Sequence, residues 1–425
     1  MLIHSASELL TLSGGPQRGA RLGSLGIIPD GAVLIRDGKI AALGTTPELR
    51  RAHPDERMLD AGGHVVMPGF VDPHTHVIWA GDRAREFEMR LEGAKYMEIL
   101  AAGGGILSTV RSTRDASAEE LVRQTRPRLE RMFAHGTTTV EAKTGYGLEL
   151  QTELRMLEAL LELEGATPME IAVTFLGAHA VAPEFSEDPQ GYTDLVCQEM
   201  LPRARAWWRR NASGRPLPFV DVFCENKAFT LAQSRQILEG AQALGFPLKI
   251  HADEFENLGG ATLAVELGAT SADHLVKTSE ADIRALGSSL KTVAVALPCT
   301  PFGLSEAQYT PAKQLLAAGS LLALASDCNP GTAWNESMQF VLALACRYMG
   351  LTPAQAIAAA TINAAAAIGR EDRVGSVEIG KQADLLILDV ADHRQLGYRF
   401  GTNLVRHVIK RGKLFAVDGG FRENS

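Results

Sequence analysis

Eight short apolar segments constrain the fold of this chain more than any other feature of its sequence. They cover residues 69–72, 138–142, 171–176, 220–224, 248–251, 271–274, 292–297 and 321–326. Amphipathic helical stretches separate most of them, and strands that alternate with helices predict a parallel sheet. Eight strands also suffice to close a (β/α)8 barrel, so we expect an α/β barrel. The alternative is an open doubly wound sheet, but no G-x-G-x-x-G motif follows a strand here.

Both ends of the chain have a different character, with short strands and tight turns. Residues 31–40 contain an Asp-Gly turn between apolar residues, which is typical of a β-hairpin. Residues 383–389 have the pattern of a buried strand, and residues 404–417 that of a second hairpin. Because chain ends commonly lie close together, we expect one small β-sandwich domain from residues 1–66 and 376–425. The barrel domain then covers residues 67–375.

The composition argues against several classes of protein. The formal net charge is −8 and the chain has no basic tract, so we expect no binding to nucleic acid. No run reaches the roughly 20 apolar residues of a membrane-spanning helix, so we expect no membrane partner. The five cysteines form no C-x-x-C pair, and the first residues lack the layout of a signal peptide. These features favour a cytoplasmic protein.

His74 and His76 stand at the end of the first predicted strand. Residues two apart in a strand point to the same face, so both imidazoles can reach one point. Taken alone, the pair is as consistent with two ordinary histidines near a turn as with two metal ligands. The other predicted strand ends carry further ionisable side chains, among them His179, His251, His274 and Asp327.

Five of the eleven histidines therefore fall at one end of the predicted barrel, the end where barrel enzymes carry their active sites. This constellation resembles the amidohydrolase superfamily, and the resemblance covers the whole chain. It implies a TIM-like barrel with a small β-sandwich built from both chain ends. It also implies one divalent or trivalent metal ion per subunit, Zn²⁺ or Fe, held by His74, His76, His251 and Asp327.

Two details favour a single metal ion over a pair. Binuclear members of the superfamily carry a lysine, often carboxylated, at the end of strand four. Lys227 lies beyond that apolar segment, and we interpret it as an ordinary loop lysine. The His-x-x-Glu spacing from His251 to Glu254 instead resembles the mononuclear, deaminase-like branch. A metal ion held there would activate a water molecule for hydrolysis at neutral pH.

Six longer motifs narrow the resemblance further. They lie at residues 71–76, 80–87, 103–110, 143–148, 175–179 and 326–332. Together they resemble the motifs of the imidazolonepropionases, a family that opens the cyclic amide of 4-imidazolone-5-propanoate to give N-formimidoyl-L-glutamate in histidine degradation. The resemblance implies this small molecule as the substrate and a homodimer as the assembly.

Opening a neutral lactam requires an activated nucleophile, polarisation of the carbonyl and a proton for the leaving nitrogen. At the predicted strand ends, Asp327 can accept the proton of the attacking water. His274 can stabilise the oxyanion, and Glu254 can pass a proton to a ring nitrogen. A packed histidine and a surface carboxylate are the structural alternatives for these last two residues.

The substrate also carries a propanoate, which a guanidinium group binds through two parallel hydrogen bonds. Arg83 follows the metal-binding strand by seven residues, and the resemblance assigns it this role. Without the resemblance it cannot be ranked above the rival arginines Arg85, Arg111 and Arg114. Further substrate contacts are implied for Tyr146, His179, Glu254, Asn329, Gly331 and Thr332.

The segment 101–109 is rich in glycine. It is not a P-loop, because no Gly-Lys-Ser/Thr follows. We interpret it as a mobile part of the long first connection, and residues 101–114 as a candidate lid.

Two other functions share part of this pattern. A nucleobase or heterocycle deaminase of the same superfamily would use the same metal ligands and the His-x-x-Glu spacing, but it would not need Arg83 to bind a carboxylate. A catalytically inactive relative that serves as a scaffold would usually lack metal ligands, whereas all four are present here.

Overall fold

The computed structural model describes residues 1–94, 104–415 and 417. Its larger sheet has eight parallel strands in the order β13-β12-β11-β10-β9-β8-β7-β6. The strands are β6 (Phe70–Asp72), β7 (Thr137–Lys143), β8 (Glu170–Ala178), β9 (Phe219–Cys224), β10 (Lys249–Ala252), β11 (Ser271–His274), β12 (Val293–Ala296) and β13 (Leu321–Leu324). Each of the eight predicted apolar segments overlaps one of these strands.

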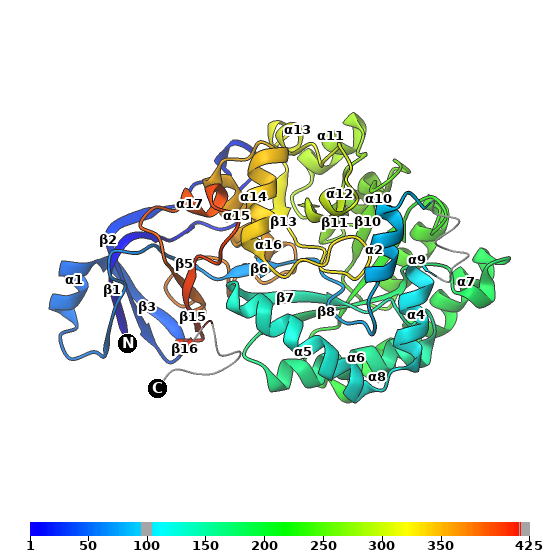
Figure 1. Cartoon of the computed structure of the whole chain (residues 1–425), viewed down its shortest axis with the longest axis horizontal. Helices are drawn as coiled ribbons and strands as arrows, with labels where there is room; N and C mark the ends of the chain where they lie inside the picture. The colour runs from blue at the N-terminus through cyan, green and yellow to red at the C-terminus, as the bar shows by residue number, and fades with distance from the viewer. Residues whose placement is uncertain (95–103, 416, 418–425) are drawn as a thin grey trace.

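The sheet closes because the chain segments that follow its two edge strands meet. Thr75, after β6, forms a parallel bridge with Cys328, after β13. The amide of Asp327 donates to the carbonyl of His74 at 3.1 Å, and the amide of His76 donates to the carbonyl of Cys328 at 3.0 Å. Closure excludes the open doubly wound sheet, and the predicted (β/α)8 barrel is confirmed (Figure 1).

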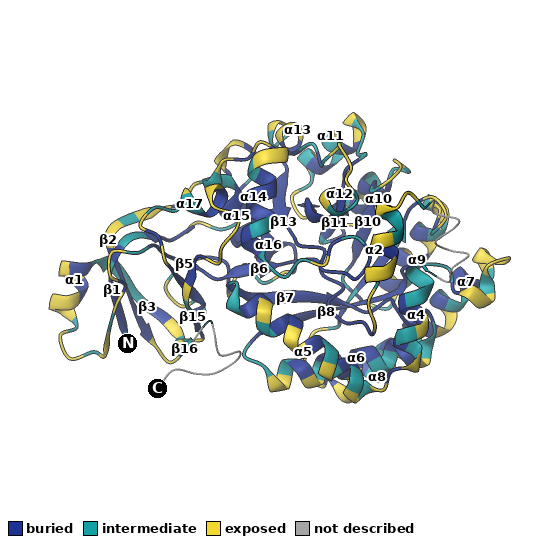
Figure 2. Cartoon of the chain, in the orientation of Figure 1, coloured by how far each residue is buried: buried dark blue, intermediate teal, exposed yellow. Residues whose placement is uncertain are grey.

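Helices cover the outside of the barrel, and their inner faces are buried (Figure 2). α9 shows why: a capping box between Thr230 and Gln233 starts the helix, and Ile237, Leu238 and Ala241 form its buried face. None of the described helices is long and apolar enough to cross a membrane.

The described α-helices after β6 are α2 (Ala84–Leu91), α4 (Ile106–Asp115), α5 (Ala118–Ala134), α6 (Leu150–Ala166), α7 (Pro189–Leu195), α8 (Leu201–Asn211), α9 (Leu231–Ala243), α10 (Gly260–Glu266), α11 (Glu280–Ser288), α12 (Cys299–Gly303), α13 (Ala312–Ala317), α14 (Met338–Tyr348), α15 (Pro353–Ala359), α16 (Ile362–Ala366) and α17 (Gln395–Tyr398).

The second sheet combines both ends of the chain in the order β16-β15-β14-β5-β1-β2-β3, with β4 beside β1. From the N-terminal part come β1 (Leu2–Leu10), β2 (Ile27–Arg36), β3 (Lys39–Thr45), β4 (Met58–Asp60) and β5 (Val66–Pro68), together with α1 (Thr46–Ala52). From the C-terminal part come β14 (Leu385–Leu388), β15 (Val405–Lys410) and β16 (Lys413–Phe415). β5 pairs with β1 on one side and with β14 on the other.

Both predicted hairpins are present in this sheet. At the β2–β3 turn, Asp37 and Gly38 have φ values of 51° and 73°, and at the β15–β16 turn Arg411 and Gly412 have 49° and 76°. Two successive positive φ values are the geometry of the type I′ turn, which matches the twist of paired strands. A small domain from both chain ends is therefore confirmed. Its boundaries at 66/67 and 375/376 stay a prediction.

The first connection, between β6 and α5, is long and holds α2 and α4. Residues 95–103 lie outside the described residues, so the candidate lid at 101–114 is described only from residue 104 onward. The described part includes most of α4, which begins at Ile106, a residue that lines the same cavity as His76 and His251.

Candidate active site

The predicted metal ligands gather where the barrel strands end. His74 and His76 follow β6, His251 lies in β10 and Asp327 follows β13. Two residues of the site have left-handed backbone, with φ of 78° for His274 and 54° for Asp327. Such conformations cost roughly 1–3 kcal/mol each and are concentrated at functional sites.

Four side chains converge on one point. Nε2 of His74 and Nε2 of His76 lie 3.5 and 3.6 Å from Oδ1 of Asp327. Nε2 of His251 lies 3.2 Å from Nε2 of His76. Ligand atoms about 2.0–2.1 Å from a tetrahedral ion stand about 3.3 Å apart, so these separations suit one shared ion. The structure thus brings all four predicted metal ligands together.

Buried carboxylates occupy the outward ring nitrogens of two of these ligands. Nδ1 of His74 lies 2.7 Å from Oδ2 of Asp273, and Nδ1 of His251 lies 3.0 Å from Oδ2 of Asp221. The contact of His74 is a hydrogen bond, and a histidine whose Nδ1–H is held in this way presents the lone pair of Nε2. The contact of His251 is a close approach of its ring to the carboxylate. Among the described residues, Nε2 of His74 is buried without a hydrogen-bond partner. An orphaned acceptor facing a carboxylate and further imidazoles fits a metal ligand.

Burial also sets the charge of the ligands. Desolvation holds the pKa of His74 and of His76 well below its ordinary value, which favours the neutral imidazoles that metal binding requires. Desolvation raises the pKa of Asp327 to about 6. The Thr300 hydroxyl donates a hydrogen bond of 2.5 Å to the carboxylate, and this contact partly offsets the rise in the pKa. A cation between these side chains would favour the ionised carboxylate.

His274 is a further imidazole of the cluster. With His74 and His251 it also offers ligand atoms within 4.8 Å of one another. Neither of its ring nitrogens has a hydrogen-bond partner in the described part of the chain, and Nδ1 lies 3.6 Å from Oε2 of Glu254. Because it faces both the ligands and Glu254, its ring stands where it can contact a substrate oxygen.

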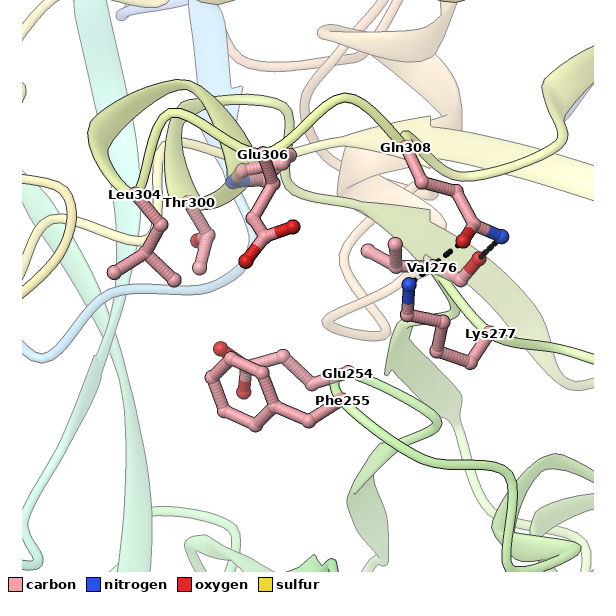
Figure 3. Close-up of a pocket in the computed structure, with 9 residues that line it drawn as sticks. Glu254, Phe255, Val276, Lys277, Thr300, Leu304, Glu306 and Gln308 are labelled. Atoms are coloured by element: carbon pink, nitrogen blue, oxygen red, sulfur yellow. Dashed lines mark hydrogen bonds between the residues drawn. The ribbon is translucent and has the colours of Figure 1, made fainter. Parts of the chain in front are cut away.

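Glu254 is partly buried, with a side chain 10% exposed, which speaks against a fully solvated surface carboxylate. Desolvation, with Asp327 nearby, raises its pKa well above the ordinary value and favours the protonated carboxylic acid. Together with Phe255 it also lines a neighbouring pocket, across from Thr300 and Leu304 (Figure 3). Glu254 therefore borders both this pocket and the cavity of the site.

One cavity opens beside the four ligands. Its wall is formed by His76, Arg83, Ile106, Tyr146, His179, Phe223, His251, Glu254, Phe255, His274, Asp327, Asn329, Gly331 and Thr332. Every residue predicted from the sequence to act on or bind the substrate is in this wall, and His74 lies fully buried behind it. Ile106, Phe223 and Phe255 were not predicted, since an apolar residue near a strand end carries no distinctive signal. The individual roles stay predictions.

Arg83 reaches this wall from the start of α2. Its Nη2 lies 2.7 Å from Oε2 of Glu86, whose other carboxylate oxygen accepts the amide of Gly105 at 2.9 Å. The guanidinium also packs on Gly331, where an added Cβ would lie 2.3 Å from Nη1 of Arg83. Of the rival arginines, Arg114 is directed elsewhere, to the carbonyl of Gly147 and to Glu184. Arg85 is exposed and Arg111 is not part of the described cavity wall.

The side chain of Asn329 stabilises the loop after β13 through hydrogen bonds to its backbone. The side-chain oxygen of Asn329 accepts the amides of Gly331 and Thr332, both at 2.8 Å, and its nitrogen donates to the carbonyl of Asp327 at 2.7 Å. Much of the hydrogen-bonding capacity of this side chain is therefore used within the loop. The arrangement supports a role of Asn329 in shaping the wall as well as in touching a ligand.

Tyr146 and His179 form the opposite part of the wall. Their ring centroids are 5.2 Å apart, and Nδ1 of His179 lies 3.0 Å from the carbonyl oxygen of Gly145, which leaves Nε2 as an acceptor. Desolvation lowers the pKa of His179 to about 3 and raises that of Tyr146, so both are neutral at pH 7. Glu153 in α6 shapes this loop, because its buried carboxylate accepts the amides of three residues: Gly145, Gly147 and Leu148.

A layer of fully buried charges lies beneath the ligands, and sequence reasoning assigned it no role. Lys143, at the end of β7, contacts Glu141 at 2.6 Å and Asp221 at 2.9 Å. Lys249 lies 3.6 Å from Asp273. Five charged residues inside β-strands are a detectable signal, but the sequence does not say which of them meet. Lys227, interpreted as a loop lysine, is not part of the described cavity wall.

Comparison with known proteins agrees with this geometry. A model described as "Amidohydrolase family" matches residues 65–415, and one described as "Imidazolonepropionase-like composite domain, bacteria" matches residues 31–55. An imidazolonepropionase of Herpetosiphon aurantiacus is 53% identical, with 97% of this chain and 96% of the relative covered. One of Symbiobacterium thermophilum is 49% identical, with 99% and 98% covered.

Among solved structures, an adenosine deaminase from Xanthomonas campestris with bound zinc superimposes with a TM-score of 0.73. It covers 100% of this chain and 94% of its own, at 20% sequence identity, and so supports the fold alone. The full-length similarity to the curated relatives is far higher. This chain belongs to the amidohydrolase family and, within it, to the imidazolonepropionases.

Proposed function

We propose that this chain hydrolyses the cyclic amide bond of 4-imidazolone-5-propanoate to N-formimidoyl-L-glutamate, a step of histidine degradation. The observation that carries the proposal is one cavity whose wall combines the guanidinium of Arg83 with His76, His251 and Asp327, with His74 directly behind Asp327. Relatives named imidazolonepropionase match nearly the whole chain. A deaminase, the alternative, is favoured by no specific contact, because a neutral nucleobase leaves Arg83 without a carboxylate to bind.

The donor set His74, His76, His251 and Asp327 would hold one Zn²⁺ or iron ion, since imidazole and carboxylate ligands suit both. Bound there, the ion would supply Lewis acidity that activates water near pH 7. Beneath the site, three buried carboxylates (Glu141, Asp221 and Asp273) contact two buried lysines (Lys143 and Lys249). Asp327 adds a further carboxylate among the ligands themselves.

Three side chains handle the protons of the reaction. Asp327, ionised beside the bound cation, accepts the proton of the attacking water. His274 donates an N–H to the carbonyl oxygen as it gains negative charge. Glu254, kept protonated by burial, gives its proton to the ring nitrogen as the C–N bond breaks, so the leaving group departs neutral.

The remaining wall positions the substrate. Arg83 binds the propanoate through the N–H groups that its contact with Glu86 leaves available. Tyr146 donates its hydroxyl proton, and Nε2 of His179 accepts an N–H of the ring. Holding both ends of a small substrate fixes the carbonyl carbon beside the metal ligands, which is a large part of rate enhancement.

The decisive experiment assays hydrolysis of 4-imidazolone-5-propanoate with metal analysis of the same sample. We expect about one metal ion per chain, loss of activity with a chelator, and recovery with Zn²⁺ or Fe²⁺. Arg83→Ala should raise KM roughly 10- to 150-fold, the equivalent of about 1.5–3 kcal/mol for a charge-assisted hydrogen bond. Arg85→Ala, which removes an exposed neighbour, is the matched control. Unchanged kinetics of Arg83→Ala would refute the substrate assignment.

A homodimer in the cytoplasm completes the proposal. The family resemblance supports the dimer, and the five free cysteines among the described residues suit a reducing compartment. Sedimentation of the purified chain tests the assembly, since a monomer at micromolar concentration would contradict it.

A further inference from the structure

Two of the histidine ligands depend on carboxylates that meet the same lysine. Oδ2 of Asp221 lies 3.0 Å from Nδ1 of His251, and Oδ2 of Asp273 forms a hydrogen bond of 2.7 Å with Nδ1 of His74. Nζ of Lys143 lies 2.9 Å from Oδ2 of Asp221 and 3.8 Å from Oδ2 of Asp273. In each case the lysine approaches the same carboxylate oxygen that faces the histidine. One ammonium group is therefore linked to both ligands through a single intervening side chain.

Lys143 is also linked to the remaining histidine ligand. Its shortest contact is with Oε1 of Glu141, at 2.6 Å. The second oxygen of Glu141 accepts the amide of Thr75 at 3.1 Å, and the hydroxyl of Thr75 donates to the carbonyl of Glu141 at 2.6 Å. Thr75 separates His74 from His76, so these contacts fix the backbone that carries both histidines.

Lys249, the other fully buried lysine of the barrel strands, makes only one of these links. Nζ of Lys249 donates to the carbonyls of Pro73 and Ala367 at 3.1 and 3.2 Å and reaches only Asp273, at 3.6 Å. Its two hydrogen bonds go to backbone carbonyls, one of them at Pro73, directly before His74, and neither connects the carboxylate partners of two ligands. Lys143 is thus distinguished among the described lysines by bridging the partners of separate ligands.

We propose that Lys143 is a positioning residue for the metal centre, which holds Asp221, Asp273 and Glu141 so that His74, His76 and His251 aim their Nε2 atoms at one point. This inference rests on the ligand set of the proposed function. A three-donor ammonium suits the task, because it bonds several carboxylates at once without the planar constraint of a guanidinium. Groups that orient metal ligands typically change metal affinity by about 10- to 100-fold when removed.

The test compares two charge-neutral double variants of the full chain. Lys143→Met with Glu141→Gln removes the lysine and one of its carboxylates. Lys410→Met with Asp384→Asn removes another buried ion pair, 2.7 Å apart, in the mixed sheet. Both variants lose a buried ammonium and a buried carboxylate, and only the first touches the ligand supports. The readouts are Zn²⁺ affinity in competition with a chelator, the absorption bands of the Co²⁺-loaded protein, and thermal unfolding of the metal-free chain.

We expect Zn²⁺ affinity to fall about 10- to 100-fold and the Co²⁺ bands to shift in the Lys143 variant, with wild-type affinity and bands in the Lys410 variant. If the Lys143 double variant is insoluble, Lys143→Arg keeps the charge but moves its contact points, and we expect at least about a threefold loss of affinity. If the soluble Lys143 variant keeps wild-type Zn²⁺ affinity and wild-type Co²⁺ absorption bands, this inference is overturned and the proposed function is unaffected. A wild-type chain that binds no metal would overturn it together with the proposed function.

Discussion

Replacement of Gly331 by alanine tests whether the cavity wall places Arg83. A Cβ at position 331 would lie 2.3 Å from Nη1 and 3.0 Å from Cζ of Arg83. The backbone of Gly331 has no positive φ, so alanine itself is not strained there. The collision involves the end of a long side chain, which yields more easily than the backbone.

The distances indicate how far Arg83 must move. Ordinary contact between carbon and nitrogen requires about 3.4 Å, so Nη1 has to retreat by about 1 Å. A displacement of that size shifts the guanidinium relative to a bound propanoate and disturbs its 2.7 Å contact with Glu86. Misplacement by about 1 Å can cost up to about 100-fold, so we expect KM to rise roughly 10- to 100-fold. Unfolding free energy should fall by no more than about 1 kcal/mol.

Steady-state kinetics with 4-imidazolone-5-propanoate and thermal unfolding measure the two effects separately. Gly401→Ala is the control, since a Cβ there meets no atom within 4 Å. The double variant with Arg83→Ala shows whether the effect passes through the arginine. We expect Gly331→Ala to add almost nothing once Arg83 is absent, because interacting residues are not additive. An equal rise in KM with and without Arg83 would refute the reasoning, as would an unchanged KM in the single variant.

Two further predictions concern Glu254 in the cavity wall and Glu153, which supports the loop of Tyr146. Glu254→Gln should lower kcat about 10²- to 10⁴-fold, because an amide cannot supply the proton. Since burial raises the pKa of Glu254, the wild-type kcat should stay constant around neutral pH and fall as the pH rises through that pKa. If kcat of Glu254→Gln falls over the same pH range, the assignment of Glu254 as the proton donor is contradicted. Glu153→Gln should destabilise the chain by about 1–3 kcal/mol in urea unfolding, because one of its two acceptor oxygens becomes an NH2 group that faces a backbone N–H of the Tyr146 loop. Glu158→Gln, on the exposed face of the same helix, is its control and should unfold like the wild type.

Local sequence patterns predicted the barrel strands and placed His74 and His76 at the end of the first of them. Strand periodicity, turn residues and the spacing of His74 and His76 are encoded within a few neighbouring residues. Residues at strand ends must share one rim once the strands are parallel, so the strand count placed His251 and Asp327 on that rim. The family resemblance then selected them as metal ligands among the other ionisable residues there. The resemblance then supplied Arg83, Tyr146 and the loop after β13, which no periodicity distinguishes from their neighbours.

The tertiary structure alone decided which buried groups meet. Lys143 is 78 residues from Asp221 and 130 from Asp273, and Arg83 is 248 residues from Gly331. These contacts depend on how the barrel closes, where the segments after β6 and β13 come together. In the sequence, a lysine within an apolar strand pattern is unexpected, because burying an unpaired charge is costly. Only the closed barrel surrounds it with the carboxylates that make its burial possible and connect it to the metal ligands.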